Sequence, residues 1–360
     1  GKNKPEKIIN ITNILKGSGF LGAALQSTDP EVLKAIKRDN IPTDKIMNLA
    51  EFGKEQGNPT YTEIILGLPS DSKEKHFESL RVGVDMGLNS IRMYQLMLLA
   101  GTEMASPQSR KTFEMIIKWR ILPGCAGKYQ VLGKEYRIAE YEEIVVGNKT
   151  LSFYDYLECR LMNLLIETFI NNALFEEIFG IIQALGLSRF DCLLYILNHP
   201  ETYPETIQSY FKSYINDTTN DLFETEEEVK AYTQREGHIE DYVSGTSGRK
   251  ELLYHKALCY LSFEDLNQML CTATIQFLKE NGKLTEKITD YVKSLEKFSM
   301  LCKKSFENTT LEYVESFEYD FKSLAKRNFE IDPNQIEPCG PFTFHIKHSQ
   351  TQISLIQNAL

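Results

Sequence analysis

Two kinds of segment alternate along the first hundred residues. Continuous apolar runs over Phe20–Ser27, Thr60–Leu68 and Ser90–Thr102 are typical of strands that helices cover on one face. Between them, apolar residues recur at the spacing of an amphipathic helix. Residues 1–101 therefore predict the order helix, strand, helix, helix, strand, helix, strand. Such alternation predicts parallel strands joined by right-handed crossovers.

Capping residues mark where the predicted helices begin. The segment Asp29–Glu31 supplies a cap, a proline at the first helical position and an acidic residue in the first turn. Either Ser70 or Asp71 can cap the helix that runs to Met86. Two further helices are predicted over Pro5–Lys16 and Thr43–Gln56.

The strand ends carry the candidate site, because ligands bind at the carboxyl ends of parallel strands in open sheets and barrels. Strict alternation would put Gly22, Ala24 and Gln26 on one face, whose small residues suit a lumen that holds a ligand. Glu63 lies in an otherwise apolar strand, which is costly unless the carboxylate meets a donor or stays wet. Gly67 would let the backbone approach a ligand. The alternative is that Gln26 and Glu63 only hydrogen-bond loop backbone.

The pattern changes after residue 101. Lys128–Lys149 holds β-prone runs broken by glycine and predicts a small strand pair or an irregular linker. Residues 151–199 are strongly helical, and helices are also predicted further on, including one over Thr285–Arg327. The polar, glycine-rich stretch Thr233–Leu253 predicts a surface loop, with a flexible loop over a pocket as the alternative.

Charge and cysteine usage exclude several function classes. The formal net charge of the 360-residue chain is -10, which argues against binding nucleic acid through its phosphates. No apolar run is long enough for a membrane span, and the start lacks a secretion signal, so a cytoplasmic protein is expected. The seven cysteines form no CxxC or CxxxC pair, and His345 and His348 have no third ligand nearby. No metal site is predicted.

Three segments carry a family resemblance. LGAALQSTDPEVLKAIKRDN, TEIILGLPSDSKEKHFESL and QLMLLAGTEM resemble, in order, the fourth-, fifth- and sixth-strand regions of radical SAM enzymes. KWRILPGCAGKYQ resembles the region after the barrel in members with an amino-terminal cobalamin-binding domain. The resemblance implies an α/β fold, the second half of a partial (β/α)6 TIM-like barrel, followed by a mostly helical carboxyl-terminal domain. The expected regions are the half-barrel at 1–119, a linker with short strands at 120–150, a helical domain at 151–330, and a strand and helix segment at 331–360.

The resemblance also implies cofactors. Radical SAM enzymes use S-adenosylmethionine and a [4Fe-4S] cluster, and this branch combines them with cobalamin, for methyl transfer or other radical chemistry on a small molecule. The family's CxxxCxxC loop and first three strands are absent from this sequence. The sequence therefore predicts a carboxyl-terminal part, inactive alone, whose partner is the missing amino-terminal half. The alternative is a non-catalytic binding or scaffold protein that kept a half-barrel.

Family contacts to the cofactor fall on strand ends of this sequence. The resemblance has Arg38 pair with the cofactor carboxylate, whereas a solvent-exposed helix end is the alternative. Glu63 is the acidic residue before Gly-Leu-Pro, and Tyr94 and Gln95 would face adenine or substrate. The complete set of expected cofactor-binding residues is Gln26, Ser27, Arg38, Glu63, Gly67, Tyr94 and Gln95.

Overall fold

The computed structural model describes residues 14, 21–40, 46, 48, 52–53, 59–303 and 308–359. The chain divides into two compact units, each made of two stretches. The predicted helices over Pro5–Lys16 and Thr43–Gln56 lie almost entirely outside the described residues. The first unit comprises Gly1–Glu167 and Lys212–Tyr254, and the second comprises Thr168–Phe211 and His255–Leu360.

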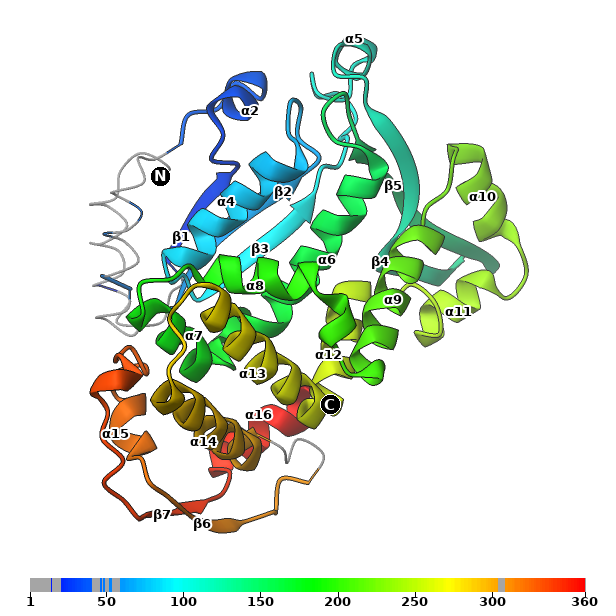
Figure 1. The fold of residues 1–360 in the computed structure, drawn as a ribbon. Coiled ribbons are helices and arrows are strands. Elements are labelled where there is room, and N and C mark those ends of the chain that lie inside the picture. The colour runs from blue at the N-terminus through cyan, green and yellow to red at the C-terminus, as the bar shows by residue number, and fades with distance from the viewer. Residues whose placement is uncertain are drawn as a thin grey trace. The chain divides into compact units, whose positions relative to one another are not determined.

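A three-stranded parallel sheet lies in the first unit (Figure 1). Its strands β1 (Leu21–Gln26), β2 (Thr60–Leu66) and β3 (Ser90–Gln95) are adjacent in that order. The three predicted strands and their parallel arrangement are thus confirmed. Within the described part of the chain, β1 pairs with β2 alone and forms one edge of the sheet. Closure of a barrel stays a prediction.

Helix α2 (Pro30–Ala35) begins as predicted, because the Asp29 side chain accepts hydrogen bonds from the first-turn amides. Helix α4 (Lys73–Asp85) begins later than predicted. Its cap is Ser72, whose hydroxyl accepts from the Lys75 amide, rather than Ser70 or Asp71. Helix α4 can lie close to the sheet because Gly83 has no side chain, and a Cβ there would lie 3.3 Å from Ile91.

A long β-hairpin replaces the small strand pair or irregular linker that the sequence predicts. Its strands are β4 (Ile116–Val131) and β5 (Lys134–Gly147), which pair in antiparallel register and follow helix α5 (Pro107–Thr112). The base of the hairpin joins the sheet: the segment after β3 pairs with β5 through Met97 and Ile144. The amide of Val145 also donates to the carbonyl of Leu96 at 2.9 Å.

The stretch Lys212–Tyr254 packs on this hairpin. Trp119 of β4 and Phe223 exchange backbone hydrogen bonds of 2.9 and 2.8 Å. Helices α10 (Glu226–Gln234) and α11 (His238–Ser244) follow and contact both strands. The expected loop over Thr233–Leu253 is therefore wrong in part, since α11 forms within it.

The second unit is mostly helical. The helix predicted over Thr285–Arg327 ends at Lys303, and strand β6 (Tyr313–Phe317) follows and pairs with β7 (Phe342–Ile346). None of the helices in the described ranges is long and apolar enough to cross a membrane singly. Helices α7 (Glu176–Ala184) and α8 (Arg189–Asn198) meet the length and composition criteria only as a pair, which is bent by 112°. The remaining elements of the chain are α6 (Phe153–Phe169), η1 (Asn171–Ala173), α7 (Glu176–Ala184), α8 (Arg189–Asn198), η2 (Pro200–Thr202), α9 (Glu205–Asn220), α12 (Glu251–Leu261), α13 (Phe263–Glu280), α14 (Glu286–Lys303), α15 (Phe321–Ala325), η3 (Pro333–Gln335) and α16 (Gln350–Ala359).

Candidate functional site

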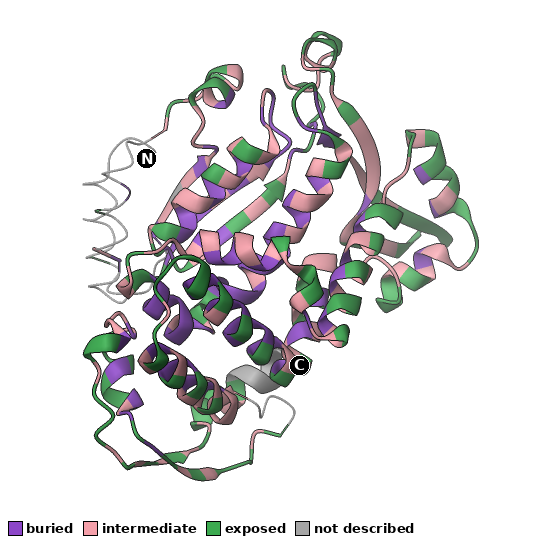
Figure 2. Ribbon diagram, in the orientation of Figure 1, coloured by how far each residue is buried: buried purple, intermediate pink, exposed green. Residues whose placement is uncertain are grey.

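The sheet of the first unit has one buried face and one more open face. Along β2, Thr62 and Ile64 are buried, whereas Tyr61, Glu63 and Ile65 are only partly buried (Figure 2). This period of two is that of a strand covered by helices on one side only. The open face is therefore the place where polar side chains of the strands can meet a ligand.

Glu63 lies on this open face, and its charge interacts with that of Arg38, another predicted site residue. Arg38 follows helix α2, and its guanidinium donates to the carbonyl of Ala24 in β1 and to Asn40 Oδ1. Burial lowers the pKa of Arg38, and the nearby Glu63 carboxylate opposes that shift. The expected alternative of a solvent-exposed helix end is wrong, because Arg38 is partly buried and bonded to the sheet.

Tyr94 lies on the same face as Glu63. In the parallel register Glu63 stands beside Arg92, and Ile65 stands beside Tyr94. The Tyr94 side chain is 47% exposed, so its ring is accessible. An accessible phenol ring and a carboxylate thus share one open face, and the charge of the Arg38 guanidinium interacts with that carboxylate.

Gln26 lies at the end of β1, but the predicted alternation fails there. The register shifts between Ala23 and Gln26, and Gln26 has a positive φ of 61°. Gln26 therefore stands beside Ile64, a residue of the buried face. The expectation that Gly22, Ala24 and Gln26 share one face is corrected, because the irregularity interrupts the period of two.

Ser27 is buried and engaged by the protein itself. Its hydroxyl accepts from the Asp29 amide at 3.2 Å and lies 3.4 Å from the Ser79 hydroxyl of α4. The Ser27 carbonyl accepts from Asn40 Nδ2 at 2.6 Å. These contacts give Ser27 a structural role at the turn from β1 to α2.

Gly67 has a structural reason for being glycine. Its φ is +88°, and a Cβ there would lie 2.8 Å from the Val145 carbonyl oxygen of β5. The backbone that approaches the end of β2 closely in this structure is thus that of the hairpin, and the approach of a cofactor at Gly67 stays a prediction. An apolar cluster surrounds this contact at the carboxyl ends of the strands, made of Val32, Leu68, Leu96, Leu98 and Val145.

Gln95 is separated from Tyr94, because neighbouring residues of a strand point to opposite faces. The side-chain oxygen of Gln95 accepts from Arg120 Nη1 of β4 at 2.6 Å. Arg120 also donates to Glu142 of β5 at 2.7 Å. The predicted pair Tyr94 and Gln95 is therefore divided between the open face and the hairpin.

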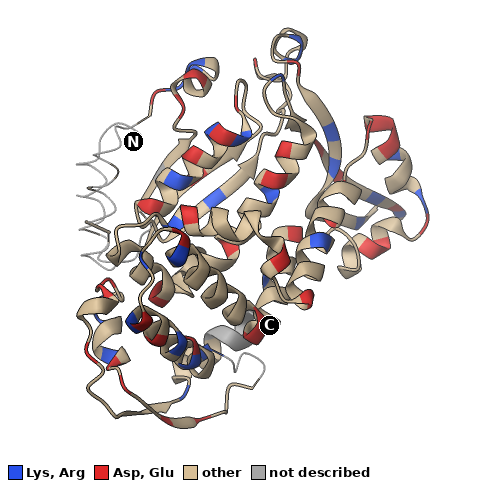
Figure 3. Cartoon of the chain, in the orientation of Figure 1, with Lys and Arg blue, Asp and Glu red and all other residues tan. Residues whose placement is uncertain are grey.

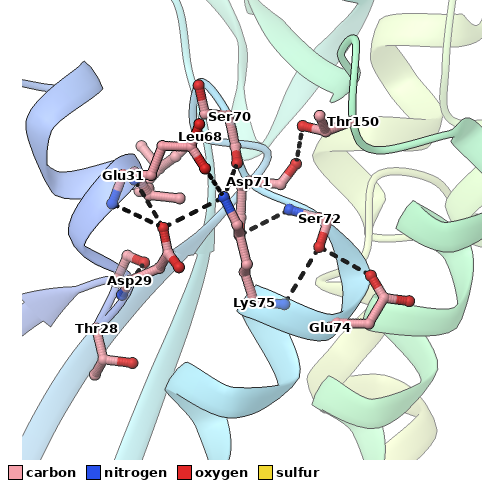
Figure 4. Close-up of polar contacts among 12 residues, drawn as sticks. Thr28, Asp29, Glu31, Leu68, Ser70, Asp71, Ser72, Glu74, Lys75 and Thr150 are labelled. Carbon is pink, nitrogen blue, oxygen red and sulfur yellow. Dashed lines mark hydrogen bonds and ion pairs between the residues drawn. The ribbon is translucent and has the colours of Figure 1, made fainter.

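Lys75 is a central residue of the strand-end loops that sequence reasoning missed (Figure 4). Its ammonium donates to Glu31 Oε2 at 2.5 Å and to the Ser70 carbonyl at 3.0 Å, and lies 3.4 Å from Asp29 Oδ1. Burial acts to lower the pKa of Lys75, but these carboxylates outweigh it and raise the pKa. The sequence feature that could have revealed this role is a lysine in the first turn of a helix, because the helix dipole disfavours a cation there unless carboxylates are near.

A surface cavity of about 440 Å³ lies beside the Gly-Thr-Glu segment that follows β3. Lys37 and Glu103 form an exposed 2.6 Å ion pair there. The residues lining the cavity are Ala35, Ile36, Lys37, Thr102, Glu103, Met104, Gln108, Ser109, Thr112 and Phe113.

Asp221 gives the hairpin region a pH-dependent stability. Burial raises its pKa to about 6, Glu251 and Asp217 add to this rise, and Arg120 opposes it. Because the folded state holds this proton more tightly than the unfolded state, Asp221 stabilises the fold below its ordinary pKa. That contribution is lost as the pH rises through about 6.

We expect Asp221→Asn to remove this pH dependence. Above pH 6, the variant should be more stable than the wild type by about 1–3 kcal/mol, since one pKa unit corresponds to about 1.4 kcal/mol. Urea unfolding of both proteins between acid and neutral pH measures the effect, with the exposed Asp39→Asn as control. Parallel pH profiles for the wild type and Asp221→Asn would contradict the assignment.

The described residues contain no group of three or more His, Cys, Asp or Glu side chains that could hold a metal ion. Burial raises the pKa of Cys159, Cys192 and Cys259, which keeps these thiols protonated and unreactive. The candidate site that remains is the set of polar and aromatic side chains on the open face of the parallel sheet.

Ligands of open parallel sheets bind in the crevice outside the carboxyl ends of the strands, and Glu63 and Tyr94 lie on the open face of such a sheet. Comparison with known proteins finds two relatives of part of this chain. The chain is 29% identical over 111 residues to the cobalamin-dependent radical SAM methyltransferase TokK of Streptomyces tokunonensis. It is equally similar to 2-(S-pantetheinyl)-carbapenam-3-carboxylate methyltransferase of Streptantibioticus cattleyicolor.

Each match covers 30% of this chain and 16% of the relative. No family model matches the sequence. The comparisons thus support, over part of the chain, the resemblance to cobalamin-type radical SAM enzymes that the strand-end motifs predict.

Proposed function

We propose that this chain supplies part of the S-adenosylmethionine site of a radical SAM-type enzyme of the cobalamin-dependent kind. The observation that carries the proposal is that Glu63 and Tyr94 share the open face of the parallel sheet and that the charge of Arg38 interacts with that of Glu63. The similarity to two cobalamin-dependent or methyl-transferring enzymes supports it. That the whole protein carries out radical chemistry, such as methyl transfer, on a small molecule is part of the same proposal and rests on it.

The side chains at the open face fit the groups of S-adenosylmethionine. The Glu63 carboxylate can accept hydrogen bonds from a ribose hydroxyl or from the amino group. The Arg38 guanidinium can pair with the carboxylate of the methionyl moiety. The Tyr94 ring can stack on adenine. Gln26 lies at the end of β1, so its side-chain amide can contact the same ligand only if the ligand extends to that end of the strand.

The ligands of an iron-sulfur cluster are not part of the site that we propose for this chain. The sequence has no CxxxCxxC loop, and the described residues offer no cluster of cysteine ligands. We therefore assign the [4Fe-4S] ligands and the cobalamin site to other parts of the protein. This chain's own contribution is to bind and orient the organic cofactor.

Binding of S-adenosylmethionine to the 360-residue chain tests the proposal. We expect saturable binding in a ligand-observed NMR titration, and a loss of about 10–150-fold in affinity for Glu63→Ala, since a hydrogen bond to a charged group contributes about 1.5–3 kcal/mol. The melting temperature of this variant should hardly change, because Glu63 is only partly buried.

Ser27→Ala is the matched control. It removes a hydroxyl that only the protein uses, so it should lower the melting temperature and leave the affinity unchanged. If the wild-type chain shows no saturable binding, the open face does not bind the cofactor by itself, and the scaffold alternative is favoured. If Glu63→Ala binds like the wild type, the fold can still be right but Glu63 is not a contact.

A further inference from the structure

The distal half of the hairpin is largely exposed (Figure 2), and one of its faces carries apolar side chains. Tyr129 and Val131 of β4 are 54% and 50% exposed, and Tyr136 and Ile138 of β5 are 42% and 49% exposed. Tyr129 and Tyr136 are direct cross-strand partners, and alternate residues of a strand share a face. The four side chains therefore form one continuous apolar surface.

The opposite face of the same hairpin is polar and serves the chain itself. Lys128 of β4 and Arg137 of β5 both pair with Glu240 of α11, at 2.5 and 3.2 Å. Figure 3 shows basic residues along the hairpin and acidic residues along α10 and α11. The hairpin thus turns its polar side inward and its apolar side outward, the reverse of an ordinary surface ribbon.

The outward face of β5 is also self-complementary in charge. In order along the strand it presents Lys134, Tyr136, Ile138 and Glu140. The Lys134 ammonium lies 5.1 Å from the Tyr136 ring centroid. Glu140 is exposed and forms no ion pair with any residue in the described ranges. The face therefore carries a positive charge at one end, a negative charge at the other, and apolar residues between them.

We propose that a second copy of this chain covers this face. A two-fold axis through the middle of the face brings Lys134 opposite Glu140 of the second copy, and Tyr136 opposite its Ile138. The same axis repeats both contacts in the other direction, so the two charged ends pair twice. A strand that was positive or negative at both ends would repel its own copy.

The size of the face sets the strength of this dimer. Exposed apolar patches on proteins reach roughly 300–600 Å², whereas a stable interface buries about 800 Å² on each partner. Four partly exposed side chains lie at the lower end of this scale. The dimer is therefore weak, and its population rises with protein concentration.

Sedimentation equilibrium of the full chain over a wide range of concentration tests the proposal. The wild type should show a monomer–dimer equilibrium. Lys134→Glu or Glu140→Lys alone should each weaken the dimer by about tenfold or more, because like charges then face each other twice. The double variant Lys134→Glu/Glu140→Lys should restore it, because opposite charges meet again. Ile138→Glu should abolish it.

The control is Leu132→Ser in the turn of the hairpin, where the side chain is fully exposed but lies outside the strand face. It should leave the dimer unchanged, and circular dichroism should show that every variant is folded. A chain that is monomeric at all concentrations overturns the proposal, as do single charge swaps without effect or a double swap that does not recover. Binding of monomer to phosphatidylcholine vesicles through this face would overturn it in favour of a lipid surface.

Discussion

Replacing Gly67 with alanine should lower the free energy of unfolding by about 2–4 kcal/mol, one of the largest effects that a single methyl group can have in this protein. Part of this loss is backbone strain, because a left-handed conformation at φ +88° costs an L-residue about 1–2 kcal/mol. The rest comes from contact, because the new Cβ would lie 2.8 Å from the Val145 carbonyl oxygen. That oxygen belongs to β5 backbone and cannot rotate away.

Gly101→Ala separates the two causes. Gly101 has a similar φ of +81°, but a Cβ there would meet nothing within 4 Å. The Gly101→Ala variant should therefore show only the cost of backbone strain, a loss of about 1–2 kcal/mol in the free energy of unfolding. Urea unfolding of both variants without any cofactor gives the comparison. Equal losses would mean that the hairpin does not press on the end of β2, and the approach of a ligand would again be the better reason for Gly67.

The parallel sheet could be predicted because its signals are local. Continuous apolar runs end at glycine or polar residues, and the cap at Asp29 stands directly before a proline. Boundaries were harder where several residues offer the same chemistry. Ser70, Asp71 and Ser72 can all accept from a first-turn amide, and only the packing of α4 selects Ser72.

The hairpin could not be predicted at its full length, because its strands lack a clean alternation. The segment Leu122–Cys125 contains a proline and a glycine, and the register of the two strands shifts across it. From the local sequence alone, a proline and a glycine predict the end of a strand. The structure keeps the strands together because α10 and α11 and the bridge from Phe223 support them, and these contacts come from about a hundred residues further along the chain.

The residues of the candidate site show the same difference between what the local sequence predicts and what distant contacts decide. Glu63 could be singled out from the sequence, since a carboxylate inside an apolar strand is costly unless it meets a donor or stays wet. Arg38 was expected only from the family resemblance, as a partner of the cofactor carboxylate, and its interaction with Glu63 was not predicted. The roles of Gly67 and Gln95 could not be predicted, because Val145 and Arg120, their partners, both lie in the hairpin. The predicted face of Gln26 was wrong for a different reason: a positive φ at a strand end follows from no sequence period.

The largest single loss of stability should come from removing Glu251. Its carboxylate lies 2.6 Å from Arg160 Nη2, and the Arg160 side chain is only 3% exposed. The guanidinium also lies 5.5 Å from the Tyr214 ring centroid. Without Glu251 the charge of Arg160 stays buried with its main counter-ion gone, which typically costs about 3–5 kcal/mol. We therefore expect Glu251→Ala to unfold at much lower urea concentration than the wild type.

Arg160→Met should cost less, and this asymmetry tests the cause. It leaves behind the carboxylate of Glu251, whose side chain is 15% exposed and can recruit water more easily than the guanidinium can. Replacing both residues with apolar ones, as in Arg160→Met/Glu251→Leu, removes the charges together and should recover most of the loss, because a buried ion pair contributes little net stability over an apolar pair. A double variant whose loss equals the sum of the single losses would show that the two side chains act independently, and that burial of an unpaired charge does not explain the effect of Glu251→Ala.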